Sequence, residues 1–348
     1  MVSVCIVTYN SMKYLPYFLD SIFHQSYWQE RGESPDIFIV DNASSDKTVE
    51  YIRTNFPAAH LLRNVNNIGL SRAWNQAIKM THGEYLLIMN PDVILDEKFL
   101  SILVKDMEDN ADLGSAGGKL YQLDFEKEGD YLIAPAKTTT LDSCGLLGYK
   151  SRRFVDRGAG EKDLSQYNQK EEVFGISGAC LLVRRSALER LKFGEEYFDE
   201  SFFMYQEDID LAWRLQLSGY RSIYDPAATA WHHRRARSGQ KSQLATLKYR
   251  RDKENLVNFH SYKNHLMLLY KNEFRNNFFL DFPHIFWYEL KKFLYVLIFE
   301  AGNFFRCWTY ILKNRGLLRQ KRRLGMKLKR VRPEEVRQWF LISNKQDK

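Results

Sequence analysis

The chain of 348 residues lacks several features that mark common classes of protein. It has only four cysteines, which lie far apart and form no CxxC pair. This spacing favours neither a disulfide framework nor a cysteine zinc site, and it suits a reducing, cytosolic compartment. The first residues, MVSVCIVTYN, lack the basic leader, long apolar region and small-residue cleavage site of a signal peptide. We therefore expect the chain to begin with a buried strand.

The chain also lacks a glycine-rich dinucleotide motif and a long uninterrupted apolar segment. A dinucleotide-binding fold of the dehydrogenase type places GxGxxG after its first strand, whereas this chain has TYNSMKYL there. The most apolar segment, residues 282–312, is interrupted by charged residues such as Glu289, Lys292 and Arg306. It lacks the roughly 20 uninterrupted apolar residues of a membrane-spanning helix. These absences argue against a dehydrogenase and against a spanning segment.

The composition favours a globular protein with a basic C-terminal third. With 45% apolar residues, the chain can bury the core of one large domain, with or without an appendage. The net charge of +8 suits a nucleic acid, an anionic membrane surface or a phosphorylated substrate equally well. However, the densely basic segment 315–332 follows the apolar segment 282–312, and this order favours helices at a membrane surface. A dimerisation element or a lid packed on the rest of the protein is the alternative.

Periodicity predicts alternating strands and helices over the first hundred residues. Such alternation is typical of an α/β fold with a mostly parallel sheet and helices on both faces, which binds ligands at the carboxyl ends of its strands. The predicted strands are 2–10, 36–42, 60–66 and 84–92, and the predicted helices are 12–26, 47–56 and 69–83.

The pattern changes after this region. Residues 120–172 are polar and contain glycine, and we interpret them as an insertion or flap. A turn, a strand and a helix are expected over 173–191, and a long amphipathic helix over 242–272. There is no internal repeat.

Polar side chains follow three of the predicted strands. Because parallel strands end at one edge of a sheet, we expect these side chains to converge on one rim. They are Thr8, Tyr9 and Asn10 after the first strand, Asp41 and Asn42 after the second, and Asn90 and Asp92 after the fourth.

Two of these residues, Asp41 and Asp92, are carboxylates, and their sequence context has both structural and chemical interpretations. Asp41 can accept a hydrogen bond from a nucleotide base, while its neighbours Ser44, Ser45 and Asp46 can cap a helix. Asp92, in the sequence NPD, can hold Mg²⁺ or Mn²⁺ together with phosphate oxygens, or it can belong to an ordinary turn.

Two further clusters carry chemistry. His232 and His233 can be solvated or can bind a cation, and the arginines that follow can grip a diphosphate. Glu207, Asp208 and Asp210 stand just ahead of a helical pattern. Favourable interaction with the helix N-terminus accounts for one or two of these three carboxylates, and the remainder is available for chemistry.

Motifs along residues 1–240 together resemble glycosyltransferase family 2, the inverting enzymes of the GT-A fold, and within it the rhamnosyltransferase-like members that build bacterial or archaeal surface polysaccharides. The resemblance implies a GT-A catalytic domain over 1–240, with a nucleotide-sugar half (1–119) and an acceptor half (120–240), followed by an amphipathic, basic helical region over 241–348. The motifs are VSVCIVTYN, DNASSD, NNIGLSRAWNQAI, YLLIMNPD, GISGACLLVRR, FDESFFMYQEDIDLAWRLQLSGYR and AWHHRRARS.

The resemblance also implies a donor site with a metal ion. Asp92 stands where the family has a metal-binding carboxylate, and Mg²⁺ or Mn²⁺ would be completed there by His232 or His233. The chain departs from many members, because Asn90 stands in place of the first aspartate of the DxD motif. The amide of asparagine is a weaker metal ligand than a carboxylate. The sequence NPD is nevertheless common among rhamnosyltransferase-like members. The donor-site residues implied are Thr8, Tyr9, Asn10, Asp41, Asn67, Gly69, Arg72, Asn75, Asn90 and Asp92, and the arginines implied at the diphosphate are Arg234, Arg235 and Arg237.

By the same resemblance, Asp208 is the base that takes a proton from the acceptor hydroxyl. Glu207 orients the acceptor or is the second candidate for the base, and Asp210 caps or supports the helix. The implied protein is an inverting, metal-dependent transferase that uses dTDP-rhamnose or a UDP-hexose. Its acceptor is a glycan or a polyprenyl-linked glycan. The resemblance also implies that the protein is cytoplasmic and peripheral at the inner face of the cell membrane.

Two other classes remain open. One is a catalytically silent protein that binds nucleotide or glycan within a polysaccharide assembly complex, although a binding module does not need both a base and a metal carboxylate. The other is a basic nucleic-acid-binding protein, which the carboxylates at the strand ends disfavour.

Overall fold

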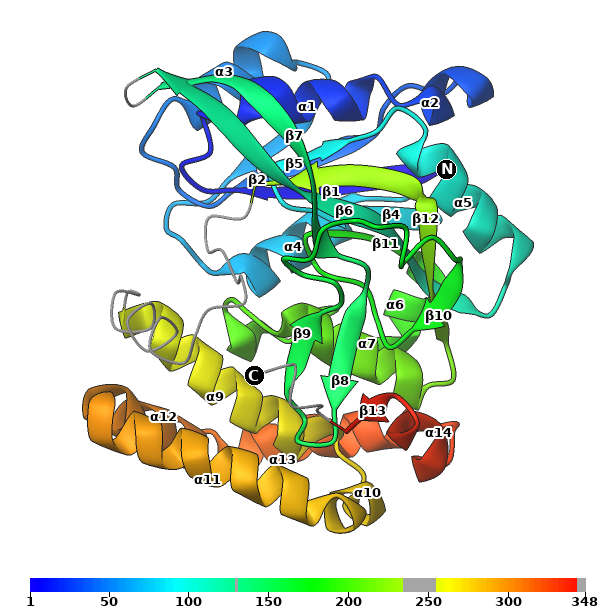
Figure 1. The fold of residues 1–348 in the computed structure, drawn as a ribbon. Helices are drawn as coiled ribbons and strands as arrows, with labels where there is room; N and C mark the ends of the chain where they lie inside the picture. Colours follow the sequence, from blue (N-terminus) through cyan, green and yellow to red (C-terminus); the bar gives the residue numbers. More distant parts are fainter. Residues whose placement is uncertain (129–130, 234–254, 343–348) are drawn as a thin grey trace.

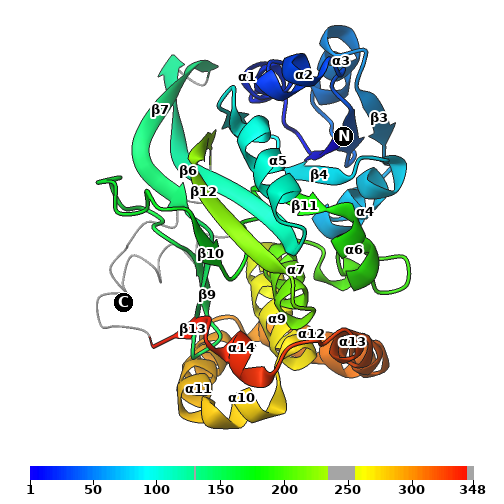
Figure 2. The same cartoon turned by 90° about the vertical axis from the view of Figure 1, so that its right-hand side faces the viewer.

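The computed structural model describes residues 1–128, 131–233 and 255–342. Its centre is a curled β-sheet with helices on both faces (Figure 1). A layer of helices from the C-terminal third lies along one end of this unit (Figure 2). The α/β fold class predicted from the sequence is confirmed.

Four parallel strands form the N-terminal half of the sheet, in the order β3-β2-β1-β4. β1, β2 and β4 are buried along their whole length, because helices cover both faces, and this explains their continuous apolar sequences. All four predicted strands are confirmed, including the one at the N-terminus. Their bounds are Val2–Thr8 for β1, Ile37–Asp41 for β2, His60–Arg63 for β3 and Tyr85–Met89 for β4.

The core lies on the two faces of this sheet. Along β1, Val4 and Ile6 join one apolar cluster while Cys5 and Val7 join the other, because successive side chains of a strand point to opposite faces. α1, α2, α3 and α5 cover the first face, and α4, α6 and α7 cover the second. The helices are α1 Leu15–Phe23, α2 Ser26–Arg31, α3 Thr48–Asn55, α4 Leu70–Met80, α5 Phe99–Asp109, α6 Arg185–Leu191 and α7 Glu207–Leu217, with a short 3-10 helix η1 at Glu200–Phe202.

The later strands make the sheet mixed. β11 runs antiparallel to β4 and to β6, whereas β12 runs parallel to β6. β5 and β10 pair with β12, and β7 pairs with β6, all in the antiparallel direction. Their bounds are β5 Val93–Leu95, β6 Leu113–Glu128, β7 Tyr131–Ser143, β10 Glu171–Val173, β11 Cys180–Arg184 and β12 Arg221–His232.

Residues 120–172, interpreted from the sequence as an insertion or flap, contain strands that the sequence did not reveal. β6 passes through Leu120, and β7, β8 (Leu146–Tyr149), β9 (Phe154–Asp156) and β10 follow it. β9 and β10 have three residues each, which is too short for an alternating pattern to be recognised.

The C-terminal third forms a helical layer that packs against α7. Trp213 of α7 shares an apolar cluster with Met267, Leu268 and Leu318. The chain then returns to the rest of the protein, where β13 pairs in parallel with β8 in a separate sheet of order β13-β8-β9. The elements are α9 Asn255–Asn272, α10 Arg275–Leu280, α11 Phe282–Phe299, α12 Ala301–Lys313, α13 Arg315–Lys327, α14 Pro333–Arg337 and β13 Phe340–Leu341.

Two sequence predictions concern this layer. The amphipathic helix predicted over 242–272 is observed as α9, and its part before residue 255 lies outside the described residues. The apolar segment 282–312 forms α11 and most of α12. None of the helices in the described ranges is both long enough and apolar enough to cross a membrane.

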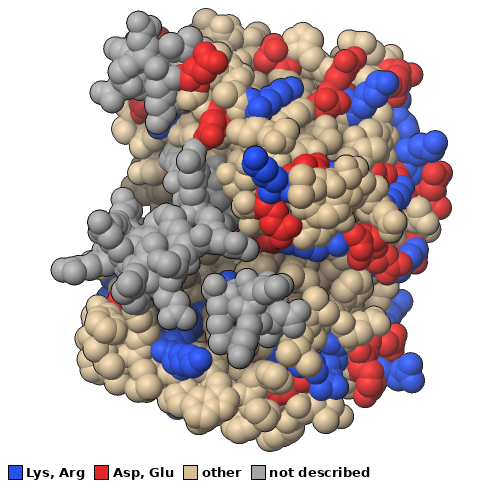
Figure 3. All heavy atoms as spheres, in the orientation of Figure 1, with Lys and Arg blue, Asp and Glu red and all other residues tan. Residues whose placement is uncertain are grey.

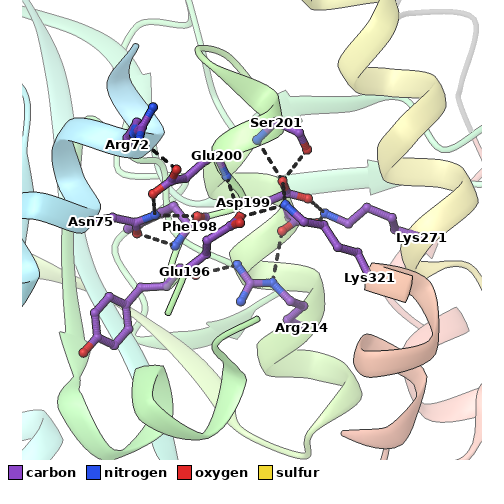
Figure 4. A network of polar contacts seen from close by, with 12 residues as sticks. Arg72, Asn75, Glu196, Phe198, Asp199, Glu200, Ser201, Arg214, Lys271 and Lys321 are labelled. Carbon is purple, nitrogen blue, oxygen red and sulfur yellow. Dashed lines mark hydrogen bonds and ion pairs between the residues drawn. The ribbon is translucent and has the colours of Figure 1, made fainter. Parts of the chain in front are cut away.

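A buried polar network joins the helical layer to the segment that precedes α7 (Figure 4). Asp199 is fully buried and pairs with Lys271 of α9 and Lys321 of α13. The Lys321 Nζ lies 2.5 Å from Asp199 Oδ1 and 2.7 Å from Glu196 Oε2. Burial raises the pKa of Asp199, but the two ammonium groups outweigh this effect and hold the pKa well below its usual range.

Asp199→Asn should destabilise the protein strongly, because two buried ammonium groups lose a counter-charge. We expect the free energy of unfolding, measured by urea denaturation, to fall by about 3–5 kcal/mol. Glu108→Gln is the control, since it breaks the ion pair of Glu108 with Arg31 at the surface, where the loss should stay below about 1 kcal/mol. Equal losses in the two variants would contradict a stabilising role for Asp199.

Candidate functional site

A cavity of about 560 Å³ opens at the edge of the sheet where β1, β2 and β4 end. Its walls are completed by the turn before β11, the start of α7 and the end of β12. This is the position at which open α/β sheets bind ligands, because the loops that follow the parallel strands meet there.

Three of the residues predicted at the donor site line one wall, namely Tyr9, Asn67 and Gly69. Gly69 has a φ of 87°, and a Cβ at this position would lie 2.5 Å from the ring of Phe203. Only glycine therefore fits where α4 begins beside the segment that leads to α7.

Asn42 holds this wall in place and also lines the cavity. Its Nδ2 donates to Asn67 Oδ1 at 3.0 Å and to the carbonyl of Gly69 at 3.2 Å. Its Oδ1 accepts from the Ile68 amide at 3.1 Å. The sequence predicts Asn42 at a strand end without a role, and the structure shows that it orders the turn before α4.

Asp41 is fully buried beside the cavity and does not line it. Thr8 Oγ1 donates to Asp41 Oδ2 at 3.0 Å, and Ser44 donates to the carboxylate through both Oγ at 2.5 Å and its amide at 2.9 Å. The Oδ1 of Asn10 accepts from the Ser45 amide at 2.9 Å. The structure thus brings Thr8, Asn10 and Asp41 together in the loops after β1 and β2, but behind the cavity surface.

Arg72 and Asn75 of α4 do not line the cavity and instead join the polar network around Asp199 (Figure 4). Asn75 is buried, donates to the carbonyl of Phe198 and accepts from its amide, both at 2.8 Å. Arg72 lies 3.4 Å from Glu200. Both side chains hold the segment around Asp199, so the structure places them in a supporting position.

Asp92 and His232 meet at a second wall. Both residues line the cavity together with Asn90. They approach because β5, which follows Asp92, pairs with the end of β12, with Val93 opposite His232. His232 Nε2 lies 3.4 Å from Asp92 Oδ1, and His232 Nδ1 lies 2.8 Å from Asp142 Oδ2.

This pair matches the chemistry of a divalent cation site. Asp92 Oδ1 is buried and accepts no hydrogen bond from the described residues. Burial lowers the pKa of His232, but Asp142 and Asp92 outweigh it and raise the pKa to about 10. Because a metal-binding histidine must be neutral, a cation bound beside Asp92 would have to displace the proton from His232 Nε2. In the described ranges no group of three or more His, Cys, Asp or Glu side chains is arranged to hold a metal, so phosphate oxygens and water would have to supply the other ligands.

The structure does not bring His233 to the cavity. Its Nδ1 lies 2.9 Å from the carbonyl of Leu123, and its ring contacts Tyr14 and Phe125, with centroids 5.2 Å and 5.0 Å away. Of the two predicted histidines, His232 alone faces Asp92. The predicted arginines Arg234, Arg235 and Arg237 lie outside the described residues.

The acidic pair at the start of α7 forms the third wall. Glu207 and Asp208 both line the cavity. Asp208 Oδ2 accepts from the Gly178 amide at 2.9 Å, and its Oδ1 accepts from the Ile209 amide at 2.8 Å. Glu207 is buried, and its Oε2 has no hydrogen-bond partner among the described residues.

Burial raises the pKa of both Glu207 and Asp208, but the two carboxyl groups differ in their hydrogen bonds. Burial and the neighbouring charge of Asp208 raise the pKa of Glu207 to about 8. Burial also raises the pKa of Asp208, although the hydrogen bond from the Gly178 amide opposes this effect. Because two neighbouring carboxylates repel each other when both are ionised, a protonated Glu207 is favoured at neutral pH.

Asp210, expected to cap or support the helix, is fully buried behind the cavity. It pairs with Arg214 at 3.0 Å and with Lys271 at 2.9 Å, and it accepts from Asn272 at 2.8 Å. The three carboxylates at the start of α7 therefore do not share one surface. Glu207 and Asp208 face the cavity, whereas Asp210 anchors α7 to α9.

A strained turn sets the direction of the acidic pair. Phe203, Tyr205 and Gln206 have positive φ values of 67°, 68° and 67°, which non-glycine residues rarely adopt. Asn264 of α9 stabilises this turn, since its Nδ2 lies 3.0 Å, 2.7 Å and 2.8 Å from the carbonyls of Phe202, Met204 and Tyr205. The helical layer therefore fixes the backbone that leads to the acidic pair.

Three residues of this site were not found from the sequence: Asp142, Asp156 and Asn264. Asp142 orients His232, Asp156 lines the cavity and raises the pKa of Asp208, and Asn264 holds the turn before α7. Asp142 and Asp156 lie in or beside strands that were not recognised, and Asn264 is an internal residue of a helix, where an asparagine gives no distinctive signal.

The cavity thus has two separate acidic centres. The Asp92–His232 centre can hold a divalent cation that balances negative charge on a phosphorylated ligand, and the Asp208 centre can accept a proton from a hydroxyl group.

Two family models match the chain. "Glycosyl transferase family 2" matches residues 3–192, which is more than half of the chain. "Glycosyl transferase family group 2" matches residues 150–313, and thus reaches into the helical layer. The match to residues 3–192 includes β1, β2, β4 and β11, whose ends border the cavity.

Curated relatives agree with this result. The chain is 30% identical over 252 residues to an N-acetylglucosaminyl-diphospho-decaprenol L-rhamnosyltransferase of Mycobacterium tuberculosis, covering 68% of this chain and 77% of the relative. It is 26% identical over 233 residues to a poly-beta-1,6-N-acetyl-D-glucosamine synthase of Staphylococcus epidermidis, covering 66% of this chain and 49% of that synthase.

A solved structure supports the fold. The crystal structure of GalNAc-T7 with UDP, GalNAc and Mn²⁺ aligns with a TM-score of 0.56 at 13% sequence identity, over 78% of this chain and 48% of that chain. This likeness concerns the fold alone. Because the family model covers more than half of the sequence and a curated relative reaches 30% identity over two thirds of it, the chain belongs to glycosyl transferase family 2 and has the GT-A fold.

Proposed function

We propose that the protein is an inverting, metal-assisted glycosyltransferase that acts in the synthesis of a cell-surface polysaccharide. The observation that carries this proposal is the arrangement of Asp92–His232 and Asp208 as separate acidic centres on the walls of one cavity. A transferase of this kind needs both, because one centre must hold the cation that balances the charge of the leaving group while the other removes a proton from the acceptor.

Asp208 is the base in this proposal. Its carboxylate takes the proton of the acceptor hydroxyl while that oxygen forms a bond to the anomeric carbon of the donor sugar. The bond between this carbon and the diphosphate oxygen breaks on the opposite face, and the nucleoside diphosphate leaves with the electron pair, so the configuration is inverted. Glu207 is less suited to this role, since a pKa of about 8 leaves it protonated at neutral pH.

The donor is a nucleotide sugar, either dTDP-rhamnose or a UDP-hexose. Tyr9, Asn67 and Gly69 would border it on one wall of the cavity, with Thr8, Asn10 and Asp41 behind them near the base. Asp92 and His232 would hold Mg²⁺ or Mn²⁺, and Asp142 fixes the orientation of the His232 ring, as carboxylates do for metal-binding histidines. When bound, the ion neutralises charge that develops on the diphosphate.

The acceptor is a glycan or a polyprenyl-linked glycan. The name of the mycobacterial relative describes a lipid-linked sugar as its acceptor, which supports this class. Residues 1–240 would form the catalytic part, with the donor half in 1–119 and the acceptor half in 120–240. Residues 241–348 would form the region that contacts the membrane.

Peripheral contact with the inner face of the cell membrane is supported by the surface of α10–α12. Large apolar side chains are exposed there, and an exposed apolar patch is typical of a surface that contacts a membrane or another protein. They include Phe279, Leu280, Phe286, Trp287, Ile298, Phe299 and Phe305.

Asp208→Asn should abolish transfer while leaving nucleotide binding intact. The amide keeps the size of the side chain but cannot take the proton, so we expect the transfer rate to fall by about 10²–10⁴-fold. Release of nucleoside diphosphate in the presence of acceptor measures the rate, and a thermal shift with UDP or dTDP measures binding. Asp20→Asn is the control, because it changes an exposed carboxylate of α1 that does not line the cavity. Full turnover by Asp208→Asn would show that another group is the base.

Asp92→Asn should remove the metal-dependent part of nucleotide binding. For the wild type we expect UDP or dTDP with Mn²⁺ to raise Tm by roughly 5 °C at a concentration about 100-fold above Kd, and by less without the ion. The variant should show the same small shift with and without Mn²⁺. Asp20→Asn, which changes an exposed carboxylate of α1, is the control. If no nucleotide stabilises the wild type under any condition, the silent binding protein becomes the better description.

Glu207→Gln should remove a pH dependence of stability. The pKa of Glu207 is raised in the folded state, so its contribution to stability is complete below the unfolded pKa of about 4.3 and is lost as pH rises through about 8. The wild type should therefore lose more stability than the variant between pH 5 and pH 9, with a slope of at most about 1.4 kcal/mol per pH unit. Tm measured across this range tests the expectation.

The same variant separates the roles of the two acids. Because glutamine resembles a protonated glutamate, Glu207→Gln should retain most of the transfer rate at neutral pH, unlike Asp208→Asn. A loss as large as that of Asp208→Asn would show that both acids are needed for transfer.

A further inference from the structure

A second hollow, of about 500 Å³, lies outside the catalytic cavity, among α10, α13 and the ends of the segments beside them. It is bordered by the end of α9 and the start of α14, which lie together at the lower end of the molecule in Figure 2. Its walls carry five basic side chains and no acidic one. The basic residues are Arg275, Arg319, Arg322, Arg323 and Lys329.

Arg322 is held in the wall of the hollow by hydrogen bonds, whereas the head groups of three other basic residues are available to bind an anion. Arg322 donates to the carbonyls of Tyr270 and Glu273 at the end of α9. By contrast, the head groups of Arg319, Arg323 and Lys329 form no ion pair or hydrogen bond with any other described residue. Repulsion among neighbouring cations is unfavourable, so an anion that enters the hollow would offset it. Arginine binds phosphate oxygens in particular, because its planar head group donates two parallel hydrogen bonds.

Exposed apolar side chains lie on the helices next to the hollow. α10 contributes Arg275 to the hollow and exposes Phe279 and Leu280, which are 73% and 60% accessible. α11 follows at once, with Trp287 60% accessible. In Figure 3 the lower edge of the molecule, formed by these helices, is mostly uncharged. A cationic hollow beside exposed aromatic side chains matches a lipid surface, where phosphate groups lie just above the acyl chains.

We propose that this hollow binds the phosphate of anionic lipid headgroups and so docks the helical layer on the membrane. The inference rests on the membrane contact proposed above and deepens it, because it names the chemical group and the residues that would bind it. A nucleic acid also presents phosphates, but it would leave the apolar side chains of α10 and α11 exposed to water.

Arg319→Gln/Arg323→Gln is the informative variant. Both side chains are exposed and lie one helical turn apart on α13, so their replacement should leave the fold intact. Lys79→Gln/Lys105→Gln is the matched control, since it removes the same charge from exposed positions on α4 and α5. A thermal shift with UDP and Mn²⁺ should be equal in the wild type and both variants, which verifies that the catalytic half is folded.

The test is sedimentation of the full chain with vesicles of phosphatidylcholine, alone or mixed with phosphatidylglycerol. We expect the wild type to bind the mixed vesicles and the Arg319/Arg323 variant to bind them on the order of 30-fold more weakly, because each cation near an anionic surface contributes about fivefold. The control should change by less than about twofold, because its charges lie far from the surface.

Three results would overturn the proposal. Equal losses in both double variants would show that net charge, and not the hollow, governs binding, while the membrane contact itself would stand. Absence of wild-type binding to either vesicle would remove the membrane contact; if inorganic diphosphate then stabilises the wild type but not the Arg319/Arg323 variant, the hollow binds free phosphate. Preferential binding of single-stranded DNA through Arg319 and Arg323 would assign the hollow to nucleic acid.

Discussion

The burial of charge between the sheet unit and the helical layer is the constraint on which the rest of the structure depends. Asp199 has no access to solvent, and it is tolerated there only because Lys271 and Lys321 pair with it. These two lysines come from α9 and α13, so neither helix can move without separating buried charges. Asp199 precedes Glu207 and Asp208 by only a few residues. The geometry of the acidic pair therefore depends on an electrostatic contact with the C-terminal third of the chain.

Carboxylates that share one cavity must also be kept from repelling each other, and this protein does so in three ways. Asp92 faces the imidazole of His232, Asp208 accepts two backbone hydrogen bonds, and Glu207 is driven toward its neutral form by burial. Asp208 combines a raised pKa with a position on the cavity wall and two backbone hydrogen bonds that favour its charged form. These are the properties that a base for a hydroxyl proton requires.

The sequence predicted those parts of the site that local patterns determine. The strands around Asp41 and Asp92 are continuous apolar runs that end in polar residues, and the acidic residues beside Asp208 precede a clear helical pattern. The pairing of β5 with β12 that brings His232 to Asp92 cannot be read from either segment, because it depends on contacts between distant strands. For the same reason the sequence could not separate His232 from His233: their directions follow from the alternation of side chains along β12, and that strand was not recognised.

α13 shows why the C-terminal third is more than an appendage. Successive residues of a helix differ by about 100°, so Lys321 lies on the side opposite to Arg319 and Arg323. The inner side chain, Lys321, is buried and compensated by Asp199 and Glu196, whereas the outer two, Arg319 and Arg323, are exposed beside the basic hollow. A helix is only about 10 Å across, so a phosphate bound on the outer side would lie close to the network that holds the segment before α7. The same helix would then place the catalytic half at a fixed distance from the lipid surface, which is what transfer to a lipid-linked acceptor requires.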